Sequence, residues 1–348
     1  MPKSFIQTFL NNYMSASLIA TIALLLGVSI GSQSIPFSSI WKTVLHQLFH
    51  TPTNVPATVS QIIVAIRLPR VILAFLIGAS LALAGVAFQG LLKNVLADPY
   101  TIGVSSGAAV GAVLVFFFQL QFSLLGRFTL PIVSIIFALV TLLFVLLFAR
   151  LAERNMAMET IVLIGIIINA FFGSLISLMV AFSGEELRQV ISWLMGSVAM
   201  RGWSYVSLFV PFFIIGSLGL FAHIRELNAF SFGERVAANI GVHLLQKKLA
   251  ILLSASLLTG GAVAVSGTIG FVGLVIPHMT RLICGANHRK LLPLSFLYGG
   301  TFLVLADVVA RTIVSPRELP IGVITSLIGA PLFAILLFKS LRRKTGST

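Results

Sequence analysis

The sequence contains many long stretches without a charged residue, and these stretches constrain the fold more than any other feature. An apolar α-helix needs about 20 residues to cross a hydrocarbon core about 30 Å thick. The pattern is helical throughout, without the alternating segments of a membrane β-barrel. Stretches of suitable length predict ten membrane-spanning helices, at residues 15–33, 71–92, 100–118, 128–149, 160–182, 203–223, 249–266, 268–284, 291–312 and 319–338. We therefore expect an all-α polytopic membrane protein with a single domain over residues 1–348.

Composition agrees with a membrane protein and excludes two soluble classes. Only 9% of the residues are charged and 58% are hydrophobic, whereas a soluble domain carries about 25% charged residues. This excludes an ordinary soluble enzyme, and it also excludes the nucleic-acid-binding protein that a net charge of +14 would suggest by itself. The first apolar run, residues 16–30, lacks an A-x-A cleavage site, which favours a retained span over a cleaved signal peptide.

The distribution of basic residues predicts the orientation. An even number of spans puts both termini on one side of the membrane. If that side is the cytoplasm, 15 of the 23 Lys and Arg lie on the cytoplasmic side and 8 on the outer side. Because cytoplasmic loops carry an excess of basic residues, this division places both termini in the cytoplasm.

The charge-free stretch over residues 249–280 needs a special interpretation. It is too long for one ordinary span and too short for two full spans with a connection. Its middle, residues 260–270, is rich in glycine. We expect a full helix, a tight reversal and a short helix that ends near Pro277.

The inner segment over residues 225–248 contains a predicted surface helix between spans 6 and 7. Ser231 is followed three residues later by Glu234, the spacing of a capping box, in which each side chain accepts a backbone N–H at a helix start. The helix would run to about Ile240 and stop at Gly241.

One face of this surface helix is expected to be apolar, because Val236, Ala237 and Ile240 share it. The alternative partners of such a face are lipid headgroups and another protein. Ala237, Ala238 and Gly241 are small. Small side chains favour the close approach of another protein over insertion into lipid.

Glycine recurs at helical spacing at Gly103, Gly107 and Gly111. Small residues four positions apart let two membrane helices approach closely. A phosphate-binding loop is the alternative, but it needs a following lysine, and the chain has no Gly-Lys dipeptide. We therefore expect helix packing here and no ATPase activity in this chain.

No catalytic or metal-binding constellation is evident in the sequence. Cys284 is the single cysteine and cannot form an internal disulfide or a thiolate metal site. Among the six histidines, only His46 and His50 have a ligand-like i, i+4 spacing. We expect neither an enzyme nor a bound metal or cofactor.

Asp307 lies within the ninth predicted span, with Arg311 four residues further on. Charges inside a membrane cost about 2.5–3.5 kcal/mol at a helix centre on insertion scales, so each needs a reason. One interpretation is that Asp307 pairs with Arg311 on one helix face and neutralises it. The other is a proton relay, which would indicate a proton-coupled secondary transporter working alone.

Two arginines open the second predicted span, in the string Arg67-Leu-Pro-Arg70 on the outer side. With Arg311 and Arg317 they could form an outward basic rim. Such a rim either anchors the helices at the membrane surface or receives an acidic partner or an anionic solute.

Several short sequence motifs along the chain, taken together, are typical of one protein family. They include RLPR at 67–70, GASLALAG at 78–85 and DPYTIGVSSG at 98–107, and others follow in order at 193–197, 227–238, 267–278, 305–311 and 318–331. Together they resemble the permease family of iron-siderophore, haem and cobalamin ABC importers.

The resemblance implies a ten-span subunit of the bacterial cytoplasmic membrane. A second permease copy, identical or related, would complete the pathway. Two copies of an ATP-binding cassette ATPase and an extracytoplasmic substrate-binding lipoprotein or periplasmic protein would be the other partners. The implied cargo is a metal chelate, a ferric siderophore first, with cobalamin or haem as alternatives.

The resemblance also implies roles for individual residues. Docking of the binding protein is implied for Arg67, Arg70 and Arg311. Coupling to the ATPase is implied for the segment at about 226–245, in particular for Ser231, Gly233, Glu234, Arg235, Ala237, Ala238 and Gly241. A place at the gates of the pathway is implied for Asn94, Leu96, Glu159 and Thr160.

Overall fold

The computed structural model describes residues 3–31, 35–50, 52 and 54–345, and regular structure in this part of the chain is helical. The elements are, in chain order, α1 (Lys3–Ser29), α2 (Phe37–Phe49), α3 (Ala57–Gln61), η1 (Ile62–Arg67), α4 (Leu68–Leu92), η2 (Pro99–Ile102), α5 (Val104–Phe117), η3 (Gly126–Phe128), α6 (Thr129–Ala152), α7 (Met158–Phe182), α8 (Leu187–Leu194), α9 (Gly202–Ala222), α10 (Ile224–Ser231), α11 (Glu234–Asn239), α12 (Leu244–Ser266), α13 (Val272–Cys284), α14 (His288–Thr312) and α15 (Ile321–Thr345).

Each of the ten predicted spans coincides with one of these helices, but the helices differ in length. Within the described residues, seven are long and apolar enough to cross a membrane. The other three, α5, α13 and the stretch 321–336 of α15, are apolar but shorter. Each of α5 and α13 follows a short break in the helix. The residues of that break would have to add to the helix length for the segment to cross the membrane. The count of ten spans therefore stays a prediction.

The reversal after α12 is confirmed, but the predicted end of the next helix near Pro277 is wrong. Backbone φ is positive at Gly267 and at Phe271, which turns the chain between α12 and α13. Helix α13 then continues through Pro277 to Cys284. A proline removes one backbone hydrogen bond. Helix α13 packs against both α4 and α14.

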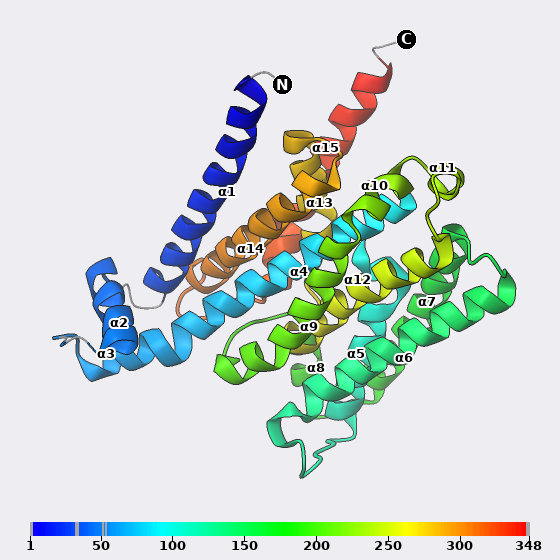
Figure 1. Ribbon diagram of the computed structural model, residues 1–348. Helices are drawn as coiled ribbons and strands as arrows, with labels where there is room; N and C mark the ends of the chain where they lie inside the picture. The colour runs from blue at the N-terminus through cyan, green and yellow to red at the C-terminus, as the bar shows by residue number, and fades with distance from the viewer. Residues whose placement is uncertain (1–2, 32–34, 51, 53, 346–348) are drawn as a thin grey trace.

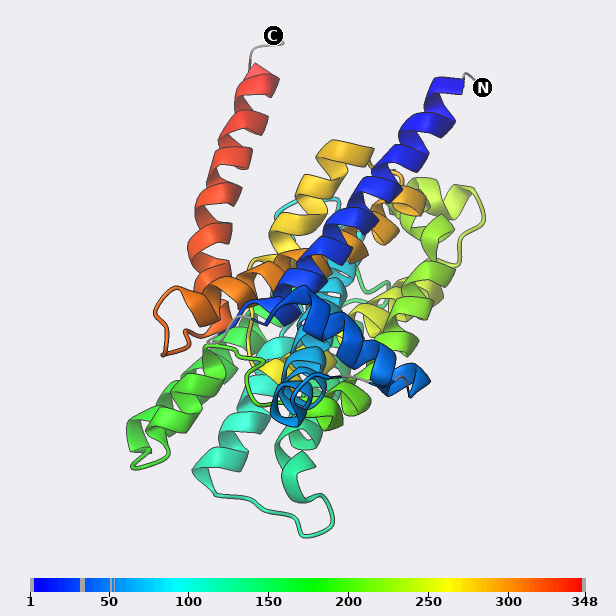
Figure 2. The same cartoon turned by 90° about the vertical axis from the view of Figure 1, so that its left-hand side faces the viewer.

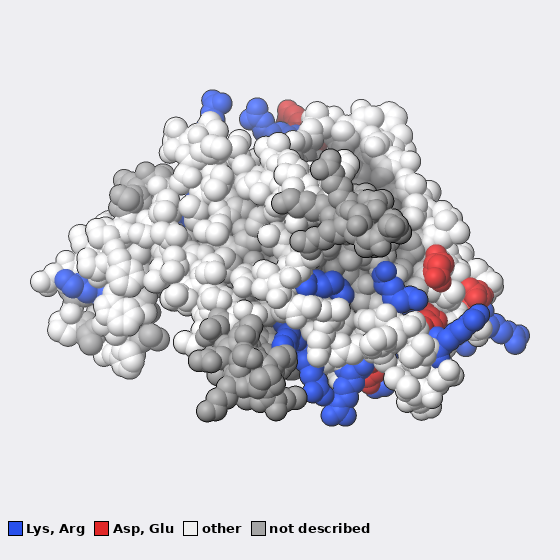
Figure 3. Space-filling model, turned by 90° about the horizontal axis from the view of Figure 1, so that it is seen from above, with Lys and Arg blue, Asp and Glu red and all other residues white. Residues whose placement is uncertain are grey.

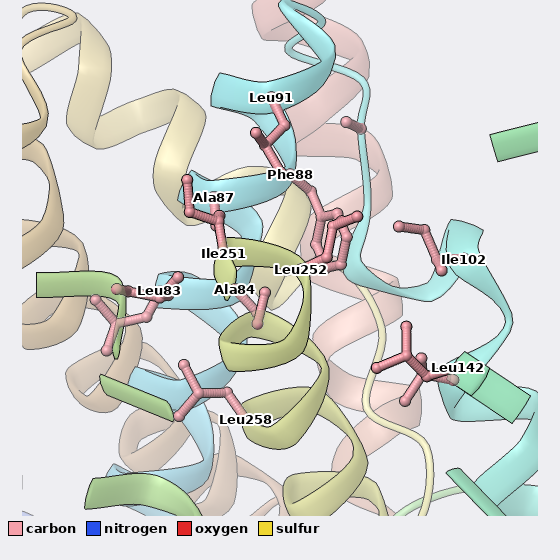
Figure 4. Close-up of a cluster of buried hydrophobic side chains, with 14 of the residues drawn as sticks. Leu83, Ala84, Ala87, Phe88, Leu91, Ile102, Leu142, Ile251, Leu252 and Leu258 are labelled. Atoms are coloured by element: carbon pink, nitrogen blue, oxygen red, sulfur yellow. The ribbon is translucent and has the colours of Figure 1, made fainter. Parts of the chain in front are cut away.

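Helix α4 lies at the centre of the bundle and contacts α14, α12, α13 and α9 (Figure 1). Of the seven long apolar helices in the described chain, α4 and α12 are the most buried and α7 is the least. Figure 4 shows Ala87 and Phe88 of α4 beside Ile251 and Leu252 of α12 in the main apolar cluster. Because lipid tails are as apolar as these side chains, close packing must hold the helices together.

Glycine makes the closest helix contacts possible. A Cβ atom on Gly107 or Gly111 of α5 would overlap Thr141 or Phe137 of α6. The expected packing role is therefore confirmed for Gly107 and Gly111. In the same way, Gly78 of α4 lies directly against the backbone of Gly299 on α14. Gly103 instead precedes α5 as its N-cap, with a φ of 89°, and a Cβ atom there would meet only ordinary contacts.

The two ends of the bundle carry different elements. The first turns of α1 and the last turns of α15 lie at one end, which also carries α10 and α11, whereas α2 and α3 lie at the other (Figures 1 and 2). Viewed from the end with the termini, Lys and Arg side chains gather over part of the surface (Figure 3). This gathering agrees with a cytoplasmic end, whose assignment stays a prediction.

Candidate functional site

Helices α10 and α11 form a short two-helix unit in place of the single predicted surface helix. Gly233 joins them with a φ of 111°, a conformation that glycine adopts without steric cost. The predicted capping box is wrong, because α10 continues through Ser231, whose hydroxyl donates to the carbonyl of Leu227 within that helix. Gly233 is the N-cap of α11, and the Glu234 carboxylate pairs with Lys248 instead.

Exposed apolar side chains lie on α11 and on the residues at either side of it, although they are not the three that were expected. Ala237 is fully buried against the rest of the protein. Phe232, Val236 and Ile240 are 77%, 45% and 66% exposed. We call these three residues the α11 patch. The small residues Ala238 and Gly241 and the charged Arg235 are also exposed around it.

The α10–α11 unit is fastened to the membrane helices by polar contacts. The carboxylate of Glu226 lies 2.9 Å from the Lys247 ammonium of α12. Desolvation by burial opposes ionisation of Glu226. The hydrogen bond and charge of Lys247, a backbone hydrogen bond and the nearby His223 together outweigh it and lower the pKa of this carboxyl. The side-chain oxygen of Asn228 accepts hydrogen bonds from the backbone N–H and the ring Nδ1 of His288, each at 2.9 Å. The unit is therefore held between α12 and α14.

The residues implied for the gates lie in two separate turns. Asn94 and Leu96 follow α4, and the Asn94 side chain accepts a hydrogen bond from the backbone N–H of Leu96 at 2.9 Å. Glu159 and Thr160 lie in the first turn of α7, where the Thr160 hydroxyl donates to the Glu153 carboxylate at 2.8 Å. Each turn is closed by its own local hydrogen bond.

A tyrosine joins the two breaks that precede the short helices α5 and α13. The hydroxyl of Tyr100 donates to the carbonyl of Ile269 at 2.7 Å and accepts from its N–H at 3.1 Å. The Asn169 amide of α7 donates to the Tyr100 carbonyl at 3.0 Å. Next to this junction, burial raises the pKa of the Asp98 carboxyl to about 6, although a hydrogen bond from the Tyr100 N–H opposes the rise. The sequence analysis did not identify this junction.

The three arginines implied in docking are buried and already hold partners. The Arg67 guanidinium donates to the carbonyls of Val28 and Ser29, at 2.7 and 2.8 Å. The Arg311 guanidinium donates to the carbonyl of Gly27 at 2.6 Å. All three arginines are less than 10% exposed, so they form no open basic rim in this structure.

Asp307 connects two of these arginines. Its pairing with Arg311 is confirmed, at 3.4 Å. The sequence analysis missed its stronger partner, Arg70, which approaches the Asp307 carboxylate at 2.8 Å and also holds Glu318 at 2.9 Å. The signal was available, because a lone carboxylate in one apolar span and an arginine bordering another tend to pair.

Comparison with known proteins places the chain in a family. The model of the FecCD transport family matches residues 19–339. The uncharacterized ABC transporter permease protein YvrB of Bacillus subtilis (strain 168) is 51% identical over 348 residues, which cover 98% of this chain and 99% of the relative. The hemin transport system permease protein HmuU of Yersinia pestis is 38% identical, over 94% of this chain and 96% of its own.

A solved structure agrees with these relatives. It is described as an inward-facing conformation of a metal-chelate type ABC transporter, and it superimposes with a TM-score of 0.81 at 36% sequence identity. The match covers 94% of this chain and 98% of that chain. Since the family model spans most of the sequence and the relatives match nearly end to end, this chain belongs to the FecCD transport family.

Proposed function

We propose that this chain is the permease subunit of an ATP-driven, binding-protein-dependent importer that carries a metal chelate across the bacterial cytoplasmic membrane. Family membership supports the class of transporter. Relatives are named for hemin, cobalamin and ferric dicitrate transport, and another is named for molybdate import. We propose a ferric siderophore as the cargo, with cobalamin or haem as alternatives. A second copy of this chain or of a related permease would complete the pathway.

The α11 patch is the observation that carries this proposal. Exposed apolar side chains on a short, firmly anchored helix indicate a surface that another protein covers. In the proposed importer that protein is the ATPase, with one copy on each permease. Closure of the ATPase pair on ATP would move α11 and open the pathway to one side at a time.

Charging the α11 patch is expected to release the ATPase. The double substitution Val236→Glu and Ile240→Glu would bury two carboxylates in the contact, and we expect at least about tenfold less ATPase to co-purify with the permease. The matched control is Leu124→Glu, which charges a 97% exposed leucine between α5 and α6, far from α11. Equal amounts of ATPase on the double variant and on the control would contradict the role of the patch.

A proton-coupled secondary transporter is not favoured. The Asp307 carboxylate, which motivated that alternative, is buried and held by Arg70 and Arg311. These contacts fit the interpretation in which Asp307 neutralises arginine. Reconstituted vesicles test the point directly, because import should require ATP and the ATPase subunit and should not follow an imposed proton gradient.

The docking role of Arg67, Arg70 and Arg311 stays a proposal, and the structure suggests how a partner could reach Arg70. Of the two carboxylates on Arg70, Asp307 has a 1% exposed side chain and Glu318 a 42% exposed one. A glutamate of the binding protein could therefore displace Glu318 and leave Asp307 in place.

Removing the displaceable carboxylate is expected to strengthen docking. In the Glu318→Gln variant, the binding protein would no longer compete with an internal charge, and we expect its affinity to rise about threefold to tenfold. Titration of the binding protein onto the permease in lipid nanodiscs measures this. Glu185→Gln, which removes another exposed carboxylate, should leave the affinity unchanged. An unaltered affinity in Glu318→Gln would count against docking at Arg70.

A further inference from the structure

A buried lysine joins α11 to the loop between α6 and α7. Lys248 lies in the first turns of α12, and its side chain is only 1% exposed. Its ammonium group lies 2.7 Å from the Glu234 carboxylate of α11 and donates to the carbonyl of Met156 at 2.9 Å. One charged group thus connects three segments that are distant in the sequence.

The loop that Lys248 holds is a closed turn leading directly into α7. Met156 is buried, has a φ of 46°, and donates its backbone N–H to the Glu153 carbonyl at 2.9 Å. The Glu153 carboxylate accepts from Thr160 in the first turn of α7. A displacement of the Met156 carbonyl would therefore be passed to that turn. Helix α7 is the least buried of the long apolar helices in the described chain.

The neighbouring lysine provides a contrast on the same turn. Lys247 has a 36% exposed side chain and pairs with Glu226 of α10 at 2.9 Å. This pair is partly exposed to water, so it contributes less to stability than a buried pair would. A buried ammonium is costly unless it is fully paired, and apolar side chains would often serve stability as well. Stability alone therefore does not account for a buried charge at residue 248.

We propose that Lys248 is a positioning residue that transmits movement of α11 to the α6–α7 loop and so to the first turn of α7. The proposal rests on the proposed function, in which the ATPase moves α11. Its chemical requirement is a donor that reaches Glu234 and Met156 at the same time. Lysine meets this requirement because its ammonium group has three N–H donors.

The first experiment needs only the permease in lipid nanodiscs, so it does not depend on the proposed function. A spin label is attached at Arg154→Cys, within the loop, after Cys284→Ser has removed the native thiol. Lys248→Met is expected to raise the mobility of the label clearly, because the Met156 carbonyl loses its donor. Lys247→Met should give the same spectrum as the labelled protein in which both lysines are intact. An unchanged spectrum in Lys248→Met would overturn the proposal.

The second experiment uses the complete importer and separates transmission from a merely structural role. Lys248→Met is expected to keep ATP hydrolysis within about twofold. In both Lys248→Met and Glu234→Ala, the amount of chelate imported per ATP hydrolysed is expected to fall about tenfold. Lys247→Met should show the native rate of ATP hydrolysis and the native amount of chelate imported per ATP. Glu234→Ala alters a partly exposed carboxylate, so it tests the link even where Lys248→Met assembles poorly.

Two results would overturn the proposal here: native import per ATP in Glu234→Ala, or hydrolysis and import falling in proportion. Failure of the proposed function would show itself differently, as an absence of ATP-dependent import by the unsubstituted protein. The label mobility at residue 154 would still decide whether Lys248 restrains the loop.

Discussion

Replacing Asp307 by asparagine is expected to destabilise the folded permease by about 3–5 kcal/mol, because the change leaves buried arginines without their main counter-charge. The Asp307 carboxylate accepts three hydrogen-bond contacts from Arg70, at 2.8–3.1 Å, and lies 3.4 Å from Arg311. Asparagine has nearly the same shape but no charge. Arg70 would then keep only Glu318, and Arg311 would keep only the Gly27 carbonyl among these contacts.

Thermal unfolding of the purified protein in detergent measures this effect, with the amount of monodisperse protein as a second readout. The control is Glu318→Gln, which removes the more exposed partner of Arg70. Surface ion pairs contribute about 0–1 kcal/mol, so this variant should unfold close to the native temperature. If Asp307→Asn and Glu318→Gln unfolded at the same temperature, the ion pairs at Asp307 would not stabilise the contact between α4 and α14.

Replacing Gly85 by valine is expected to prevent α4 and α13 from packing. A Cβ atom on Gly85 would overlap the backbone carbonyl of Gly273, and a Cβ on Gly273 would in turn press on Pro99 and the Leu81 carbonyl. Overpacking a core costs about 1–3 kcal/mol and occasionally more. The cost here should lie at the top of that range or above it, because the obstacle is backbone and can move only with its whole helix.

The yield of monodisperse protein in size-exclusion chromatography and the unfolding temperature both test this prediction. Gly173→Val on α7 is the matched control, since a Cβ atom there meets no atom within 4 Å in the described structure. We expect the control to retain native yield and the Gly85→Val protein to be largely lost or aggregated. Native behaviour of Gly85→Val would show that α13 can shift away from α4 without loss of the fold.

The positions of the helices were predictable because the membrane imposes a simple rule on the sequence. Backbone polar groups in hydrocarbon must be satisfied within a helix, so apolar length alone locates a span. Glycine spacing at Gly107 and Gly111 likewise predicted close helix packing, since side-chain size at i, i+4 positions is local information. The same reasoning placed a short helix near residues 232–241, at the end of the bundle that carries both termini.

Local rules failed where a side chain had two possible partners. Ser231 and Glu234 have capping-box spacing. In the structure, however, the Ser231 hydroxyl donates to a carbonyl of α10, and the Glu234 carboxylate pairs with Lys248. Pro277 was expected to end a helix, yet α13, which packs against α4 and α14, continues past it to Cys284. The Ser231 hydroxyl is used within its own helix, whereas the Glu234 carboxylate is drawn away by a residue of another element.

Apolar stretches and sequence motifs typical of one family were enough to predict an all-helical membrane protein of the ABC permease type, with a surface helix between the sixth and seventh predicted spans. The three-dimensional packing was needed to show that Arg67, Arg70 and Arg311 are buried, that Asp307 joins two of them, and that Lys248 connects α11 to the α6–α7 loop. The physical reason is the distance along the chain over which each interaction acts. Hydrophobic length acts within one helix, whereas a buried charge is stabilised by whichever distant segment brings it an opposite charge or a carbonyl.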